Sequence, residues 1–162
     1  MKKTPTLLMK ELKFFQEELK RLYKEDEERS YAPVNEKMEY KYETGYSYEN
    51  NRKKIHNIHE EELKIRSALA KFNATTKVDG LDMTISEALV KIGQLKDEIK
   101  VLMPMASRAE IFTEDHYASS PTTNKIIYSQ IKVKDDLTKA QRELANIQMA
   151  VDRTNLTALV EY

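Results

Sequence analysis

The sequence contains no cysteine, only three glycines and only four prolines among its 162 residues. Without cysteine, the protein cannot use disulfides, a catalytic thiol or a cysteine-based zinc site. So few glycines cannot build a glycine-rich phosphate loop, and neither G-x-x-x-x-G-K nor G-x-G-x-x-G occurs. Ser119 and Ser120 lack the G-x-S-x-G context of a hydrolase nucleophile. We therefore predict no enzymatic activity, no catalytic residue and no cofactor.

An excess of charge of either sign is also absent, because 27 basic residues balance 27 acidic ones. Proteins that bind duplex nucleic acid usually carry a clear basic excess, so this class of partner is disfavoured. No apolar run approaches the roughly 20 residues of a membrane span. Near the N-terminus, Leu7 to Met9 are followed directly by Lys10 and Glu11, which argues against a secretion signal. We expect a cytoplasmic protein without a membrane span.

Long amphipathic helices are what the sequence does contain. Scarce glycine and proline favour long regular elements, and apolar residues recur at alternating spacings of three and four in four segments. Helices of roughly 20 to 25 residues would be about 30 to 37 Å long. The four apolar stripes run from Leu8 to Leu22, from Ile55 to Phe72, from Leu89 to Leu102 and from Leu137 to Val151.

The length suits a single domain, residues 1–162. We predict a mainly α fold, an antiparallel four-helix bundle of long amphipathic helices with a small β hairpin or strand element. The helices are predicted over roughly residues 6–28, 50–75, 84–102 and 135–153. Narrow apolar stripes with charged flanks also suit coiled-coil pairing, so a homo-oligomer is expected.

Local signals set two helix boundaries. The run Val78-Asp79-Gly80 predicts a turn after the second helix. Thr84 and Glu87 have the spacing of a capping box, in which the threonine hydroxyl accepts from the glutamate backbone N–H and the carboxylate reaches back. Pro104 is expected either to end or to kink the third helix.

Two segments have β character. The tyrosine-rich insertion, about residues 36–49, alternates aromatic and charged side chains around a central glycine and predicts a short β-hairpin, with an irregular loop as the alternative. Residues 111–123 predict a polar loop. Residues 125–133, KIIYSQIKV, are rich in β-branched side chains and predict a strand that could pair with the hairpin. Asp135 or Asp136 would then cap the fourth helix.

The tyrosine-rich insertion is also a candidate binding surface. Aromatic faces beside Lys37, Lys41 and Arg52 could stack on bases or sugars, or could form a subunit interface. Packing of these rings against the helices is the alternative to an interface. The tyrosines concerned are Tyr40, Tyr42, Tyr46 and Tyr48.

The second and fourth helices share an ending: Ala, aliphatic, any residue, basic, any residue, Asn, any residue, Thr. In an up-down-up-down bundle these helices are parallel, so both endings and the start of the third helix would share one pole. Cations, amides and helix N–H groups there could hold a small anionic ligand such as a nucleotide. Capping chemistry alone is the alternative. The predicted ligand-binding residues are Lys71, Asn73, Thr75, Arg153, Asn155 and Thr157.

A histidine cluster on the second helix is a weaker candidate. His56, His59 and either Glu60 or Glu62 could share one helical face, as metal ligation would need. The ferritin-like di-iron pattern requires Glu-x-x-His twice, whereas one cluster in reversed order occurs here. His116 falls in the predicted loop. We favour a solvated polar face and predict no metal site.

The joint between the second and third helices supports a family resemblance. FNATT at 72–76, DG at 79–80 and T-x-x-E-A-L at 84–89, with the later Asn-x-Thr ending at Asn155, resemble a family of small bacterial helical proteins labelled septicolysin. The similarity covers residues 63–159. The family often has tryptophan where this chain has Leu156. The label implies a cytolysin, and the resemblance carries over no catalytic residue.

These patterns predict a non-enzymatic, homo-oligomeric helical binding protein. Its partner would be another protein, or a small anionic ligand bound or sequestered at the shared pole, with tyrosines from a neighbouring subunit completing the site. Two alternatives remain, namely the pore-forming cytolysin that the resemblance implies and a purely structural protein-interaction module.

Overall fold

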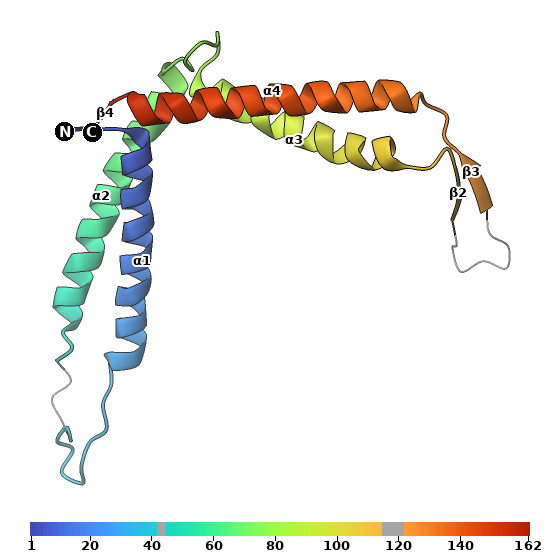
Figure 1. The fold of residues 1–162 in the computed structure, drawn as a ribbon. Helices are drawn as coiled ribbons and strands as arrows, with labels where there is room; N and C mark the ends of the chain where they lie inside the picture. Colours follow the sequence, from blue (N-terminus) through green and yellow to red (C-terminus); the bar gives the residue numbers. More distant parts are fainter. Residues whose placement is uncertain (42–44, 115–121) are drawn as a thin grey trace. The chain divides into compact units, whose positions relative to one another are not determined.

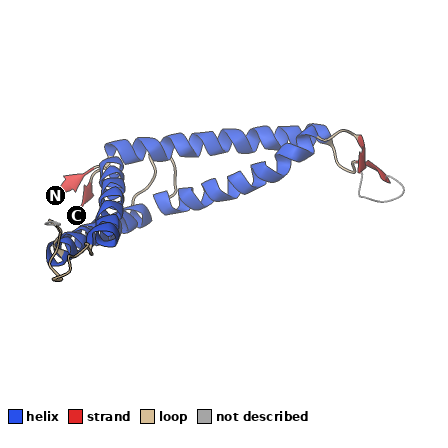
Figure 2. Ribbon diagram, turned by 90° about the horizontal axis from the view of Figure 1, so that it is seen from below, coloured by secondary structure: helices blue, strands red, loops and turns tan. Residues whose placement is uncertain are grey.

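The computed structural model of the chain describes residues 1–41, 45–114 and 122–162, so Tyr42 and His116 lie outside the described residues. The predicted mainly α class is confirmed, with four helices and short antiparallel strand pairs in the described part (Figures 1 and 2). In chain order the elements are β1 (Lys2–Lys3), α1 (Pro5–Arg29), α2 (Tyr48–Thr75), α3 (Ile85–Ser107), β2 (Ile111–Glu114), β3 (Thr122–Lys125), α4 (Gln130–Thr157) and β4 (Val160–Glu161).

The chain forms two compact units. Unit 1 comprises residues 1–73 and 155–162, and unit 2 comprises residues 74–154. In unit 1, Leu22 near the end of α1 clusters with Ile55 near the start of α2. In unit 2, the hydroxyl of Tyr128, just before α4, donates to the Met105 carbonyl near the end of α3 at 2.9 Å. Each unit is therefore an antiparallel helix pair. The assembly of both pairs into one four-helix bundle, and the single domain, stay predictions.

The core of unit 1 follows the apolar stripes of its two helices. Leu8 and Leu12 of α1 pack with Ile65 of α2 and Val160 of β4. Burying one leucine or isoleucine side chain stabilises the fold by about 1.5–3 kcal/mol. A second cluster towards the other end of the pair consists of Leu19, Leu22 and Ile55. The helices are thus held by packing along their whole shared length.

A two-stranded clasp closes one end of unit 1. β1 pairs antiparallel with β4, and Lys3 lies opposite Val160. The Tyr162 backbone N–H donates to the Met1 carbonyl at 3.1 Å, and the Met1 ammonium group donates to the Tyr162 carbonyl at 3.0 Å. Thr4 then caps α1, because its hydroxyl accepts a first-turn backbone N–H at 3.4 Å.

A similar clasp precedes α3 in unit 2. The Val78 backbone N–H donates to the Met83 carbonyl at 2.9 Å, and Lys77 forms an antiparallel bridge with Thr84. The turn between them contains Gly80, whose φ of 77° lies in the left-handed region that glycine adopts freely. The predicted turn at 78–80 is therefore confirmed.

The capping box at the start of α3 is also confirmed. The Glu87 backbone N–H donates to the Thr84 hydroxyl at 3.2 Å, and the Thr84 backbone N–H donates to the Glu87 carboxylate at 2.6 Å. Pro104 does not end α3, which continues to Ser107. Proline has no backbone N–H, so one helical hydrogen bond is lost at Pro104. The loss has little effect because less than one turn of the helix follows.

The two units share one plan. α2 and α4 contain 28 residues each, and they end at Thr75 and Thr157, which are 82 positions apart. Three positions after each ending comes a buried valine, Val78 in one case and Val160 in the other. A threonine N-cap precedes both α1 and α3. The shared ending found in the sequence is therefore the visible part of a longer internal repeat.

The prediction of a strand over residues 125–133 is wrong. The segment predicted as a polar loop instead contributes β2 and β3, which pair antiparallel with Ile111 opposite Lys125. Beyond Lys125 the chain leaves the hairpin and enters α4 at Gln130. Ile127 is fully exposed, so its β-branched side chain has no sheet on which to pack.

The start of α4 also differs from the prediction. Ser129, rather than Asp135 or Asp136, lies at the helix start, where its hydroxyl accepts the Lys132 backbone N–H at 3.4 Å. The physical reason is burial, because Val133 is buried and extends the apolar stripe of α4 one turn towards the N-terminus. Helical packing of one valine outweighed the β propensity of the segment.

The tyrosine-rich insertion does not form the predicted hairpin in its described part. A single bridge joins Val34 to Tyr40, and α2 already begins at Tyr48. The Asn35 side-chain oxygen accepts the backbone N–H groups of Lys37 at 2.9 Å and of Glu39 at 3.0 Å. Such a turn satisfies the backbone locally and competes with strand pairing.

Candidate functional site

A groove runs along one face of α1 in unit 1. It encloses a volume of about 820 Å³. Its lining residues in α1 follow the spacing of one helical face, Tyr31 lies just beyond the helix end, and α2 adds a single side chain. We call it the α1 groove, and its lining residues are Gln16, Leu19, Lys20, Tyr23, Lys24, Glu27, Glu28, Tyr31 and, from α2, Glu62.

The α1 groove has an apolar floor and aromatic walls. Leu19 is buried, whereas Tyr23 and Tyr31 are 45% and 76% exposed. The Tyr23 hydroxyl lies 3.2 Å from Nε2 of His59 on α2, so one ring is fixed between the two helices. Glu62 pairs with Arg66 at 2.6 Å, which offsets its charge at the groove edge.

Charge in the α1 groove is divided along the helix. Lys20 and Lys24 occupy its middle, and Glu27 and Glu28 follow one turn later. Lys24 and Glu28 form an exposed ion pair at 3.5 Å, a type that contributes little to stability. The surface is therefore aromatic and of mixed charge. Its tyrosines are of the kind that interfaces favour, whereas its lysines and glutamates are more typical of an interface rim.

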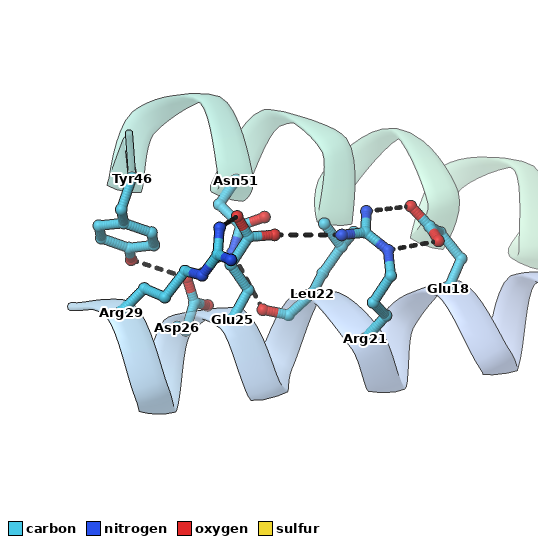
Figure 3. A network of polar contacts seen from close by, with 8 residues as sticks. All are labelled: Glu18, Arg21, Leu22, Glu25, Asp26, Arg29, Tyr46 and Asn51. Atoms are coloured by element: carbon cyan, nitrogen blue, oxygen red, sulfur yellow. Dashed lines mark hydrogen bonds and ion pairs between the residues drawn. The ribbon is translucent and has the colours of Figure 1, made fainter. Parts of the chain in front are cut away.

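A buried polar network anchors the tyrosine-rich insertion beside this helix. The Asp26 carboxylate accepts from the Tyr46 hydroxyl at 2.7 Å and from the Asn51 side-chain amide at 2.5 Å (Figure 3). The same amide donates to the Leu22 carbonyl at 3.0 Å, and Arg52 forms an ion pair with Asp26. The network joins the end of α1 to the start of α2.

Asn51 is 4% exposed, so its amide would be costly to leave unpaired. Burial raises the pKa of the Tyr46 hydroxyl, as do its neighbours Tyr48, Glu25 and Glu49, and the group therefore stays a hydrogen-bond donor. Sequence reasoning missed Asn51. The available signal was its position four residues before Ile55, on the buried stripe of α2.

On the neighbouring face of α1, Arg21 lies between Glu18 and Glu25, as Figure 3 shows. It donates to both Glu18 carboxylate oxygens, at 2.9 and 2.6 Å, and to Glu25 at 3.2 Å. This bidentate geometry fixes the guanidinium group and lowers the pKa of Glu18. The ladder belongs to the surface of one helix and reinforces it.

The described tyrosines of the predicted stacking surface have three different environments. Tyr46 is turned to Asp26, whereas the Tyr48 ring lies under the Arg52 guanidinium group at 5.4 Å. Tyr40 is 72% exposed on the loop, and Tyr42 is not among the described residues. One role, that of Tyr46, is structural, and ligand stacking by the others stays a prediction.

The six predicted pole residues are divided between the units. Unit 1 contains Lys71, Asn73, Asn155 and Thr157, and unit 2 contains Thr75 and Arg153. Binding of an anion by this set stays a prediction.

Local contacts within each unit occupy part of the predicted pole. Arg153 lies 3.4 Å from the Asp79 carboxylate, with both side chains more than half exposed. The backbone carbonyl of Asn155 accepts the Thr6 hydroxyl at 3.0 Å. These contacts are of the structural kind that the capping alternative expected.

Within the described parts of the chain, no group of three or more His, Asp or Glu side chains could hold a metal ion. His59 contacts Tyr23, and His116 is not described. None of the helices combines the length and apolar character that crossing a bilayer requires, as far as the described residues extend.

Comparison with known proteins gives a fold and no function. No family model matches the sequence, and no curated protein matches it. A solved structure from Corynebacterium diphtheriae, described as a functionally unknown conserved protein, is similar over 99% of this chain and 100% of its own, with a TM-score of 0.70 and 12% identity. At this identity the similarity concerns the fold alone. The resemblance to septicolysin-labelled proteins stays a prediction.

Proposed function

We propose that the chain is a non-enzymatic binding protein that associates with a helical partner through the α1 groove. The observation that carries this proposal is the groove itself, with its buried leucine floor, two exposed tyrosines and charges of both signs. Tyrosine is enriched where interfaces concentrate binding energy, because it buries a large ring at a small entropic cost.

The dimensions of the groove favour a helix as its occupant. Its lining within α1 extends from Gln16 to Glu28, and twelve helical rises correspond to roughly 18 Å, or about three turns. Lining positions at spacings of three and four suit the ridges of a second helix. An open groove of this kind binds a small ligand less completely than an enclosed pocket would. Homo-oligomer formation, predicted from the apolar stripes, is compatible with this mode.

Thiol accessibility tests whether the groove is occupied. The natural chain has no cysteine, so Gln16→Cys places a unique thiol in the groove and Glu17→Cys places one on the adjacent exposed face of the same helix. We expect a maleimide to label the Gln16→Cys variant more slowly in native cells than in dilute purified protein, while labelling of the Glu17→Cys variant changes little. Equal labelling of the two thiols in both settings would refute the proposal.

The cytolysin alternative comes from the family resemblance and is tested separately. Purified protein would be added to dye-loaded liposomes, and dye release would be followed over time. Release that rises with protein concentration is the expected result for a cytolysin. A flat trace would leave the binding function as the better account.

A further inference from the structure

We propose that the occupant of the α1 groove is a second copy of this chain, packed antiparallel along α1 about a two-fold axis between Tyr23 and Lys24. This inference rests on the proposed function, since it names the partner for the same groove. The resulting contact would bring two helix pairs together with both α1 helices at the centre, an arrangement typical of four-helix assemblies.

The symmetry of the lining residues supports this partner. In an antiparallel pairing, two positions face each other when their numbers add to the same total. With the axis between positions 23 and 24, all lining residues of α1 except Gln16 face another lining residue of the same groove, while Tyr31 lies beyond the helix end at Arg29. The facing pairs are Leu19 with Glu28, Lys20 with Glu27 and Tyr23 with Lys24.

The chemistry of these pairs is complementary. Lys20 would face Glu27 of the partner subunit, and because the interface is isologous, this ion pair occurs twice. The Tyr23 ring would face the ammonium group of Lys24 of the partner subunit, a favourable cation–π arrangement. The glutamate at 28 would cover the leucine floor with its aliphatic stem.

A parallel pairing would have the opposite result. It would set Lys20 against Lys20 and Glu27 against Glu27 of the partner subunit, and like charges in contact oppose association. The order of charges along α1, with two lysines before two glutamates, therefore selects the antiparallel arrangement. Neither lysine nor glutamate needs to move to another helix face for these pairs to form.

Charge reversal tests the proposal. Lys20→Glu and Glu27→Lys each replace both symmetric ion pairs with repulsive contacts, and each should weaken the wild-type dimer about tenfold or more. The double variant Lys20→Glu/Glu27→Lys should recover the wild-type dissociation constant. Lys13→Glu and Glu17→Lys carry the same charge changes on exposed α1 positions outside the groove and should leave association unchanged. Circular dichroism would establish that each variant is folded.

Mixing the two single variants gives the most specific outcome. In a heterodimer of Lys20→Glu with Glu27→Lys, both facing pairs are again of opposite charge. Native mass spectrometry should therefore show a one-to-one heterodimer from two proteins that associate poorly alone. A different interface would not give this selective pairing. A parallel register would also bring opposite charges together in the heterodimer, but there the wild type already has like charges facing each other, so neither single variant should associate more weakly than the wild type.

The failures of the two proposals can be told apart. If the thiol at 16 is protected in cells but purified wild type is a monomer by native mass spectrometry and sedimentation, another protein fills the groove and the second-copy proposal falls alone. If the thiol at 16 is never protected, the proposed function falls with it. A wild-type dimer that tolerates Lys20→Glu, or a double variant that stays a monomer, would also overturn the second-copy proposal.

Discussion

Val78 and Val160 occupy equivalent positions in the two units. Each lies three residues after the end of a 28-residue helix, and their side chains are 2% and 3% exposed. Each also lies antiparallel to the residue before a threonine N-cap: Val78 is bonded to Met83, and Val160 pairs with Lys3. Each unit thus has a buried valine at the same place in an equivalent clasp.

Replacement of either valine by alanine should therefore have a similar effect. We expect Val78→Ala and Val160→Ala each to lower the free energy of unfolding by about 2 kcal/mol, because each removes two buried methyl groups. Urea unfolding followed by circular dichroism measures this change. Val101→Ala, at an exposed position of α3, is the control and should change stability by less than about 0.5 kcal/mol. A cost at only one of the two valines would contradict their equivalence.

Loss of the capping box should depend on pH. Thr84→Ala removes the hydroxyl that accepts the Glu87 backbone N–H, and such a change typically costs about 1 kcal/mol at neutral pH. Hydrogen bonds from the Thr84 backbone N–H and hydroxyl lower the pKa of Glu87 below its usual 4.5.

A lowered carboxylate pKa in the folded protein stabilises the fold above the pKa of the unfolded chain, and this stabilisation is lost as pH falls through the folded value. The difference in stability between wild type and Glu87→Gln should consequently be larger at neutral pH than in acid. Thermal unfolding between neutral pH and pH values below 4.5 measures it. A difference that stays constant over this range would contradict the assignment.

The Asp26 network should be cooperative. Asp26→Ala removes the carboxylate that accepts hydrogen bonds from the Asn51 amide and the Tyr46 hydroxyl. We therefore expect the free energy of unfolding to fall by about 2–3 kcal/mol. Tyr46→Phe removes one hydrogen bond to a charged group and should cost less than Asp26→Ala does. Tyr48→Phe keeps its ring against Arg52 and is the matched control, with little expected change.

A double-mutant cycle then separates this network from general loop packing. If Tyr46 acts through Asp26, the cost of Tyr46→Phe should largely disappear in the Asp26→Ala background. Costs that simply add would show that the tyrosine stabilises the loop in some other way. Chemical unfolding at one protein concentration is needed, since self-association would otherwise contribute.

The helices could be predicted from the sequence because the regular spacing of their apolar residues indicates which face packs. α1 was predicted to within one residue at each end, since its stripe from Leu8 to Leu22 is continuous and a proline follows soon after. The capping box depends only on residues three apart. Such local signals need no knowledge of distant contacts.

The α1 groove and the Asp26 network could not be predicted in the same way. In the sequence, charged residues such as Lys20 and Glu27 are typical of a solvated helix face. Tyr23 is one aromatic residue among them and does not by itself indicate a groove. Asp26 and Asn51 are 25 residues apart, and only the fold makes them partners. The prediction of a strand at 125–133 failed for a related reason, because the burial of Val133 in α4 cannot be read from the local sequence.

The nucleotide site at the twin Asn-x-Thr endings is open to a direct test. If that site exists, titration calorimetry should detect binding of a nucleotide to the wild type, and Asn73→Ala/Asn155→Ala should abolish it. Asp79→Asn is an informative companion, because removal of the carboxylate beside Arg153 should strengthen binding of an anion there. Unchanged binding in the double variant would exclude the two asparagines as ligand residues.

The clasp between β1 and β4 has a topological consequence. Met1 and Tyr162 are hydrogen-bonded to each other, so the backbone comes close to forming a closed ring. The gap between these two residues occupies the place in unit 1 that the turn at Gly80 occupies in unit 2. The order of the two helix pairs along the chain could therefore be exchanged. A circular permutant that begins after Gly80, with Tyr162 joined to Met1, would contain the same two clasps.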